Sequence, residues 1–236
     1  MPTQSFIGPA IFDGTRLHHG VALNIAAGRV TSIGPPVTEP TLLPAGILAP
    51  GFLDLQVNGA GGLSVDGATT AQTLAHICAT LAKLGATGCL PTLITDTPEA
   101  TGTVIAAGIE AARASTPGFL GLHLEGPHLD PRRKGAHDPA LIRPMTDHDL
   151  AALIRAAQNL PALMVTVAPE SATPAQIAAL RAAGVVVSLG HTDCTAATAR
   201  AAGADCATHL FNAMSQLGNR EPRSEERRVG KECLRL

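Results

Sequence analysis

From residue 48 onward, near-continuous apolar runs alternate with segments whose apolar residues recur at helical spacing. The apolar runs predict buried strands, because a strand covered on both faces loses the alternation of polar and apolar side chains. These strands are expected at 52–58, 89–95, 119–125, 162–168, 185–189 and 205–209. The segments between them carry threonine caps, Thr-Pro pairs and glycine stops, which mark helix ends. The helices are expected at 70–84, 97–113, 147–158, 173–184 and 195–202.

Repeated strand–helix units favour a parallel sheet with helical crossovers, either an open doubly wound sheet or a (β/α)8 barrel. The first strand distinguishes the two, because Asp54, Gln56 and Asn58 share one of its faces. A polar face toward the carboxyl end suits a barrel lumen beneath an active site. We therefore predict an α/β fold, an incomplete (β/α)8 TIM-type barrel of about six β/α units. Residues 49–222 are too few for a complete barrel, which takes about 250 residues.

The first 34 residues alternate short apolar runs with turns, and Asp13-Gly14 is a hairpin-type signal. They predict a small β-sandwich-like layer of three strands, which needs partner strands from elsewhere to bury both faces. A proline-rich linker is expected at 34–44. The predicted domains are a small β domain at 1–47, a barrel at 48–222 and a tail at 223–236.

The composition is that of a globular protein, with 45% hydrophobic residues, 15% charged residues and a net charge of -2. This balance gives no electrostatic footprint for nucleic acid or a membrane surface. No apolar run approaches the ~20 residues of a membrane span. The five cysteines are odd in number and show no C-x-x-C spacing, so we expect a reducing, cytoplasmic location.

The last residues differ sharply in composition from the rest of the chain. Residues 223–233 resemble, codon by codon, the translation of a common sequencing-adapter oligonucleotide. We therefore expect 223–236 to be an artefactual tail and the natural protein to continue beyond Pro222. A charged, disordered tail is the alternative.

Polar residues cluster at the predicted carboxyl ends of the strands, the face where barrel enzymes carry their active sites. They are Gln56, Asn58, Glu125, His191 and His209. One carboxylate and two imidazoles form a His2Glu pattern typical of catalytic zinc, in which bound water has a pKa of ~7. Fe²⁺ accepts the same ligands. A single histidine is more often a structural core residue, but three such ligands at three strand ends favour a metal site.

Five motifs together resemble one known family. They are Gly51–Gly62, His-Leu-Glu-Gly-Pro at 123–127, Lys-Gly-Ala-His at 134–137, Gly-His-Thr-Asp at 190–193 and Thr-His-Leu-Phe-Asn-Ala-Met at 208–214. In this order, over essentially residues 1–222, the chain resembles the N-acetylglucosamine-6-phosphate deacetylases of the amidohydrolase superfamily. The resemblance implies one divalent metal ion, zinc before Fe²⁺, held by Glu125, His191 and His209.

The resemblance also implies the substrate contacts. Ala136 and His137 would contact the sugar, and Asn212 and Ala213 the substrate beside the metal. Arg220 would hold the phosphate, in this family often across a homodimer. Alternatively, His137 braces its loop and Arg220 is a solvated loop charge. Two positions depart from the two-metal superfamily pattern His-x-His, as in its single-metal branch: these possible vestiges of a second site are Gln56 and Asn58.

The implied activity is hydrolysis of N-acetylglucosamine 6-phosphate to glucosamine 6-phosphate and acetate in amino-sugar catabolism. The family's base, an aspartate after strand eight, would lie beyond Pro222, so we expect no catalytic base in these 236 residues and no activity from them alone. Alternatives are another amidohydrolase acting on a cyclic amide or an N-acyl amino acid, and a non-catalytic fragment. His123 is expected to be a buried hydrogen-bonding residue, and the role of His128 is open.

Overall fold

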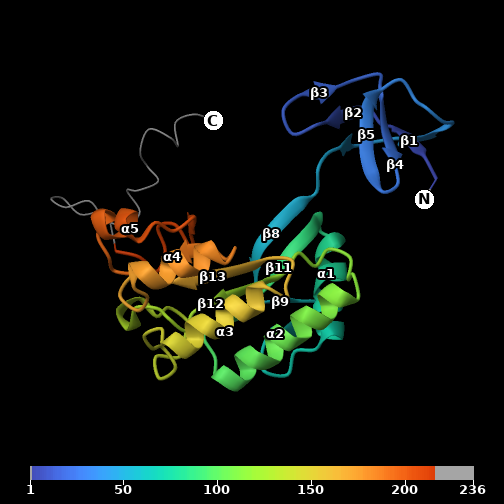
Figure 1. Cartoon of the computed structure of the whole chain (residues 1–236). Helices are drawn as coiled ribbons and strands as arrows, with labels where there is room; N and C mark the ends of the chain where they lie inside the picture. The colour runs from blue at the N-terminus through green and yellow to red at the C-terminus, as the bar shows by residue number, and fades with distance from the viewer. Residues whose placement is uncertain (1, 216–236) are drawn as a thin grey trace. The chain divides into compact units, whose positions relative to one another are not determined.

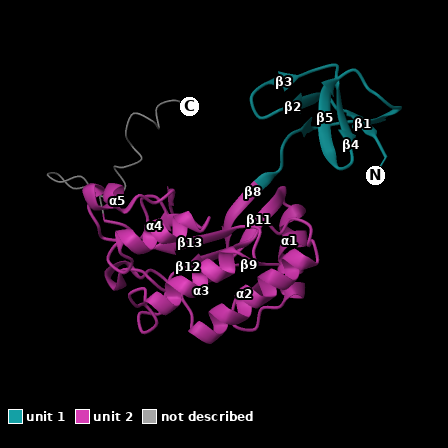
Figure 2. Ribbon diagram, viewed as in Figure 1, with its two compact units in different colours: residues 1–52 teal, residues 53–236 magenta. Residues whose placement is uncertain are grey.

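The computed structural model describes residues 2–215 (Figure 1). The chain forms two compact units, residues 1–52 and residues 53–236, coloured separately in Figure 2. The division falls between Phe52 and Leu53, a few residues beyond the predicted domain border at 47.

The first unit consists of two small sheets. The four-stranded sheet has the order β5 (Arg29–Gly34), β4 (Ala22–Ala26), β1 (Gln4–Ile7) and β6 (Pro40–Leu42). The three-stranded sheet has the order β3 (Leu17–His18), β2 (Ala10–Phe12) and β7 (Ile47–Leu48).

Two sequence-based expectations for this unit were wrong in detail. Three strands were predicted, but the described part of this unit contains seven, β1 to β7; the apolar run at 6–12, for example, is interrupted at Gly8-Pro9, and its halves β1 and β2 belong to different sheets. The segment at 34–44 is not only a linker, because β6 pairs in parallel with β1. Pro40 can begin this strand because β6 lies at the sheet edge, where a missing N–H leaves no buried acceptor unpaired.

The second unit contains a six-stranded sheet that forms a half-barrel. Its order is β15 (Cys206–Ala207), β14 (Val186–Leu189), β13 (Leu163–Val167), β12 (Leu122–Glu125), β11 (Ala86–Ile94) and β8 (Phe52–Val57). Strands β11 to β15 pair in parallel, in chain order. The prediction of about six units of a TIM-type barrel is confirmed. Leu122 and Leu124 pack with the helices, whereas Glu125 reaches the opposite face.

In the described residues, five helices alternate with these strands, and each is preceded by a threonine that caps its first turn. They are α1 (Ala71–Ala82), α2 (Pro98–Arg113), α3 (Asp147–Ala157), α4 (Pro174–Ala182) and α5 (Ala196–Ala202). The threonine hydroxyl accepts a backbone N–H that the first turn would otherwise leave unpaired, a contribution of about 1 kcal/mol each. No helix among residues 2–215 is long and apolar enough to cross a membrane.

A short hairpin and one turn of 3-10 helix were not predicted. β9 (Gly59–Ala60) and β10 (Leu63–Ser64) form a hairpin after β8. Pro131–Arg133 forms one turn of 3-10 helix in the loop after β12. Both follow strands at the end of the half-barrel where the polar residues gather.

Candidate metal centre

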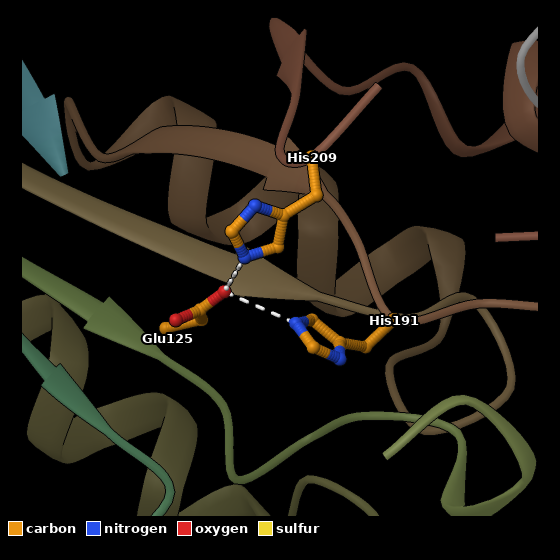
Figure 3. A group of neighbouring side chains, drawn as sticks. All are labelled: Glu125, His191 and His209. Atoms are coloured by element: carbon orange, nitrogen blue, oxygen red, sulfur yellow. Dashed lines mark hydrogen bonds and ion pairs between the residues drawn. The ribbon is translucent and has the colours of Figure 1, made fainter. Parts of the chain in front are cut away.

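The three predicted metal ligands lie together at the carboxyl ends of their strands. Glu125 is the last residue of β12, and His191 and His209 each follow the end of a strand by two residues. Nε2 of His209 lies 2.9 Å from Oε1 of Glu125, and Nε2 of His191 lies 3.1 Å from the same oxygen (Figure 3). One ligand atom from each residue lies within 4.8 Å of the others, a spacing that a single cation can bridge.

The hydrogen bonds of His191 determine which of its nitrogens faces the carboxylate as an acceptor. Nδ1 lies 2.8 Å from the carbonyl oxygen of Arg133, and because a carbonyl only accepts, Nδ1–H is the donor. A neutral His191 therefore turns the lone pair of Nε2 toward an oxygen of Glu125. Nε2 of His191 and Oε1 of Glu125 are 3.1 Å apart, and their lone pairs repel unless a proton or a metal ion lies between them. An outer N–H given to a carbonyl is also the usual arrangement of a metal-binding histidine.

Glu125 carries a negative charge in this site although its side chain is 2% exposed. Burial alone would raise the pKa of Glu125, but the hydrogen bond to His191 and the charges of His137, His191 and His209 outweigh it and lower the pKa to about 2. A carboxylate with two imidazoles is a donor set that suits Zn²⁺ and Fe²⁺. The residues present therefore fit one divalent metal ion.

The two amides that the sequence placed at the end of the first strand behave differently. Nε2 of Gln56 lies 3.3 Å from Nε2 of His209, so this side chain reaches the site. Nδ2 of Asn58 instead donates to the carbonyl of Thr92, at 3.3 Å. Only Gln56 is thus in contact with one of the three clustered residues.

Backbone strain is concentrated around the site. His191 has a φ of 50° and His209 a φ of 52°, in the left-handed region that side chains with a Cβ rarely adopt. Phe211 and Ala213, in the loop after His209, have φ values of 69° and 50°. Each such residue costs about 1–3 kcal/mol, and such strain clusters at functional sites.

The loop after β12 braces His191 through residues that sequence reasoning missed. The backbone N–H of Asp130 donates to the carbonyl of His191 at 2.9 Å. The guanidinium of Arg133, whose own carbonyl accepts from His191, donates through Nε to Asp193 at 3.0 Å. The sequence did contain a signal for this pair: Arg133 and Asp193 carry opposite charges, and each lies close to a motif that holds a predicted site residue.

His137 belongs to the same loop and is 3% exposed. The backbone N–H of Thr95 donates to its Nδ1 at 3.2 Å, so a neutral His137 carries its proton on Nε2. That nitrogen lies 3.8 Å from Oε2 of Glu125. Burial and the neighbouring His191 lower the pKa of His137 to about 4, so the ring is a neutral donor at neutral pH.

Beneath the ligands, a chain of hydrogen bonds crosses the half-barrel in one direction. Nδ1–H of His123 donates to the carbonyl of Leu55 at 3.1 Å, which leaves Nε2 to accept from Thr166 Oγ1 at 2.7 Å. Thr166 has then used its proton, so Thr208 donates to it at 2.8 Å, and Ser188 donates to Thr208 at 2.7 Å. His123 is thus a hydrogen-bonding residue, with a pKa lowered to about 4 by burial.

The remaining predicted contacts lie in two loops at the same strand ends. Ala136 is exposed beside His137 in the loop after β12. Asn212 and Ala213 follow His209, and the N–H of Asn212 donates to the carbonyl of His209 at 2.6 Å. Arg220 lies outside the described residues.

Comparisons with known proteins identify the family of this chain. A model of the amidohydrolase family matches residues 47–223. An N-acetylgalactosamine-6-phosphate deacetylase from Shewanella sp. (strain ANA-3) is 42% identical over 183 residues, 76% of this chain and 46% of that protein. An N-acetylglucosamine-6-phosphate deacetylase from Haemophilus influenzae is 37% identical over 175 residues, 73% of this chain and 45% of that protein.

A solved structure extends the similarity to the fold. The crystal structure of N-acetylglucosamine-6-phosphate deacetylase from Pasteurella multocida matches 97% of this chain and 62% of its own, with a TM-score of 0.86 and 29% identity. The chain spans about half the length of the curated relatives it matches. On sequence and fold, this chain belongs to the amidohydrolase family.

Proposed function

We propose that the protein hydrolyses the N-acetyl group of N-acetylglucosamine 6-phosphate, giving glucosamine 6-phosphate and acetate. The observation that carries the proposal is the meeting of one buried carboxylate and two imidazoles at the mouth of a half-barrel. The names of the relatives at 37% and 42% identity support the choice of an amino-sugar phosphate as substrate.

In this proposal, Glu125, His191 and His209 hold one divalent metal ion, zinc in preference to Fe²⁺. When bound, such an ion supplies a Lewis acid for the amide carbonyl and lowers the pKa of water. The neutral His137 offers its Nε2–H, the one proton its ring carries, to an oxygen of the substrate. The strained backbone at His191 and His209 keeps both imidazoles turned toward Glu125.

The same proposal assigns the substrate contacts. Ala136 and His137 lie in the loop after β12, and Asn212 and Ala213 lie in the loop after β15. These loops would hold the sugar over the metal, and Arg220 would bind its phosphate. We further propose a homodimer, as the contact of Arg220 across subunits in this family suggests, and a cytoplasmic location.

A second substrate, N-acetylgalactosamine 6-phosphate, is favoured by one specific observation. The relative at 42% identity carries the name of a deacetylase for that sugar. The two sugars differ in the configuration of one hydroxyl group, whereas the reacting amide and the phosphate are the same. The chemistry of the three clustered residues therefore serves both, and only contacts to the sugar ring distinguish them.

The test is a substrate panel, run on this 236-residue chain and on the product of its complete reading frame. Both 6-phosphates are offered together with unphosphorylated N-acetylglucosamine, an N-acetyl amino acid and a cyclic amide, with saturating Zn²⁺. Acetate release from the 6-phosphates alone, from the product of the complete frame, is the expected result. We expect none from the 236 residues alone.

The control is Glu125→Gln, which keeps the shape of the side chain and removes its charge. It should abolish acetate release while leaving the circular dichroism spectrum unchanged. Hydrolysis of the cyclic amide or the amino-acid amide in preference to both 6-phosphates would contradict the proposal. Full activity of the Glu125→Gln variant would contradict the role of the three ligands.

A further inference from the structure

A cleft of about 250 Å³ lies on the helix-covered side of the sheet, away from the three clustered ligands. Figure 1 shows the two helices that border it, α2 and α3, in front of the strands. Thr101, Gly102 and Ile105 contribute one wall, and Ala152 and Leu153 the other. Leu124 and the residues that follow Glu125 form its inner end.

A residue at the inner end of this cleft carries a buried acceptor that has no partner. His128 lines the cleft and is 2% exposed. Its Nδ1 lies 3.1 Å from the carbonyl oxygen of Arg143, so Nδ1–H donates and Nε2 keeps a lone pair. No donor among the described residues meets that Nε2. Burial lowers the pKa of His128, so the ring does not remove the problem by taking up a proton at neutral pH.

An unpaired buried acceptor is costly, about 1–3 kcal/mol, and native structures rarely leave one without a reason. The other polar groups of the cleft do not satisfy it. The hydroxyl of Thr101 already donates to the carbonyl of Thr97 at 2.9 Å. Both terminal nitrogens of Arg143 are engaged with the carboxylate of Asp149, one of them at 2.8 Å. The cleft therefore offers one unpaired acceptor to an occupant, and its guanidinium is already paired with Asp149.

Size and lining together define the chemistry of the occupant. Apolar side chains from α2, α3 and β12 cover most of the wall, including Ile105, Leu124 and Leu153. A cavity of about 150 Å³ holds benzene, so about 250 Å³ accommodates one ring with a substituent. Because the guanidinium of Arg143 is already paired with Asp149, it is not a free cation for an anionic occupant.

We propose that this cleft is a binding site for a small uncharged molecule with an apolar body and one hydroxyl or N–H donor. The donor bonds to Nε2 of His128, and the apolar body lies between Ile105 and Leu153. Gly126 and Pro127, which directly follow Glu125, also line the cleft. The occupant would thus contact the segment that carries a predicted metal ligand, and binding at the two places is expected to be coupled.

The experiment uses phenol as the probe and benzene as its matched partner without a donor. Binding to the 236-residue chain is followed by heteronuclear NMR, with the Nε2 resonance of His128 as the local reporter. Phenol should bind about tenfold more tightly than benzene, the value of one hydrogen bond to a buried acceptor. It should also move the Nε2 resonance upfield, whereas benzene should not.

Three variants separate the contributions. His128→Leu removes the acceptor and should bring the affinity for phenol down to that for benzene. Gly102→Leu should abolish binding of both, since a Cβ at Gly102 meets nothing within 4 Å and a longer side chain extends into open space. Gly102→Ala, the matched control, should bind both probes like the parent, and both substitutions improve helix propensity.

The outcomes decide the proposal independently of any enzymatic activity. Equal affinities for phenol and benzene in the parent chain would overturn it, as would phenol binding that survives both His128→Leu and Gly102→Leu. A cleft that holds water only, with no saturable binding of either probe, would also overturn it.

Discussion

Two layers of polar side chains, two residues apart along β12, behave in opposite ways. In the lower layer, His123 is fully buried and both of its ring nitrogens have partners of the matching kind. In the upper layer, Nε2 of His191 and Nε2 of His209 both lie against Oε1 of Glu125, and a neutral His191 meets it acceptor against acceptor. The lower layer is complete as it stands, whereas the upper layer leaves room for a proton or a metal ion between His191 and Glu125.

Backbone geometry follows the same division. In the upper layer, His191 and His209 have positive φ angles, as do two residues of the loop after His209. In the lower layer, His123, Thr166 and Ser188 lie within regular strands. The contrast teaches that burial and residue type do not by themselves mark a functional histidine. Here the candidate functional histidine is distinguished by a ring lone pair without a donor and by a strained backbone with a positive φ.

The largest expected effect concerns the charge of the upper layer. Glu125→Gln replaces a carboxylate ligand by an amide, and we expect affinity for Zn²⁺ to fall by more than about a hundredfold, beyond the loss of an outer-shell partner. Competition with a chromophoric chelator measures it. Glu99→Gln, in the exposed first turn of α2, is the matched control and should bind Zn²⁺ like the parent. Equal affinities in the two variants would remove the distinction between the layers.

The lower layer should respond to pH instead. The folded-state pKa of His123 is about 4, below the ordinary histidine value of 6.5 expected in the unfolded chain, because burial disfavours the imidazolium. Its contribution to stability is therefore complete above pH ~6.5 and is lost as the pH falls toward 4, about 3 kcal/mol in all. Urea unfolding of the metal-free chain between pH 7 and pH 4 measures the loss.

His123→Asn isolates this contribution from the other groups that titrate in the same range. The variant should lose less stability than the parent over the same interval of pH. His148→Asn, on the exposed first turn of α3, is the control and should follow the parent. If the parent and His123→Asn lose stability in parallel, the lowered pKa assigned to His123 is wrong.

Removing one link of the hydrogen-bond chain below the ligands should lower stability less than protonating His123. Thr166→Val keeps the shape of the side chain but leaves His123 without a donor and Thr208 without an acceptor. We expect the free energy of unfolding to fall by about 2 kcal/mol, with little effect on Zn²⁺ affinity. Thr103→Val, on the exposed face of α2, serves as control and should change stability by less than about 0.5 kcal/mol. A large loss of metal affinity in Thr166→Val would show that the layers are not separate.

The smallest expected effect tests the strain of the upper layer. Ala213 has a φ of 50°, which glycine adopts without a steric penalty. Ala213→Gly should therefore raise the free energy of unfolding, by up to about 1 kcal/mol. Ala207→Gly, within β15, is the matched control and should lower it by a similar amount. The same sign for both substitutions would mean that the left-handed backbone at Ala213 costs nothing.

The sequence predicted the second unit more accurately than the first. All six barrel strands and all five helices lie within a few residues of their predicted ranges. Periodicity and threonine caps are local signals, and a β/α repeat leaves little choice of neighbours. In the first unit, β6 pairs with β1 more than 30 residues earlier in the chain. That pairing depends on which sheet edge is open, and the prolines around it favour a linker when the segment is read alone.

Within the candidate site, the sequence by itself determined which side chains end the strands, and hence that Glu125, His191 and His209 would share one face. It also placed His123 below them. Only the tertiary structure decided which nitrogen of each ring is protonated, because that depends on carbonyls of Leu55, Arg133 and Arg143 that are distant in sequence. The tautomer of His128, whose role the sequence left open, was decided in the same way. Chain order fixes which groups are present at a strand end, but the pairing of donors with acceptors is fixed only where segments meet in space.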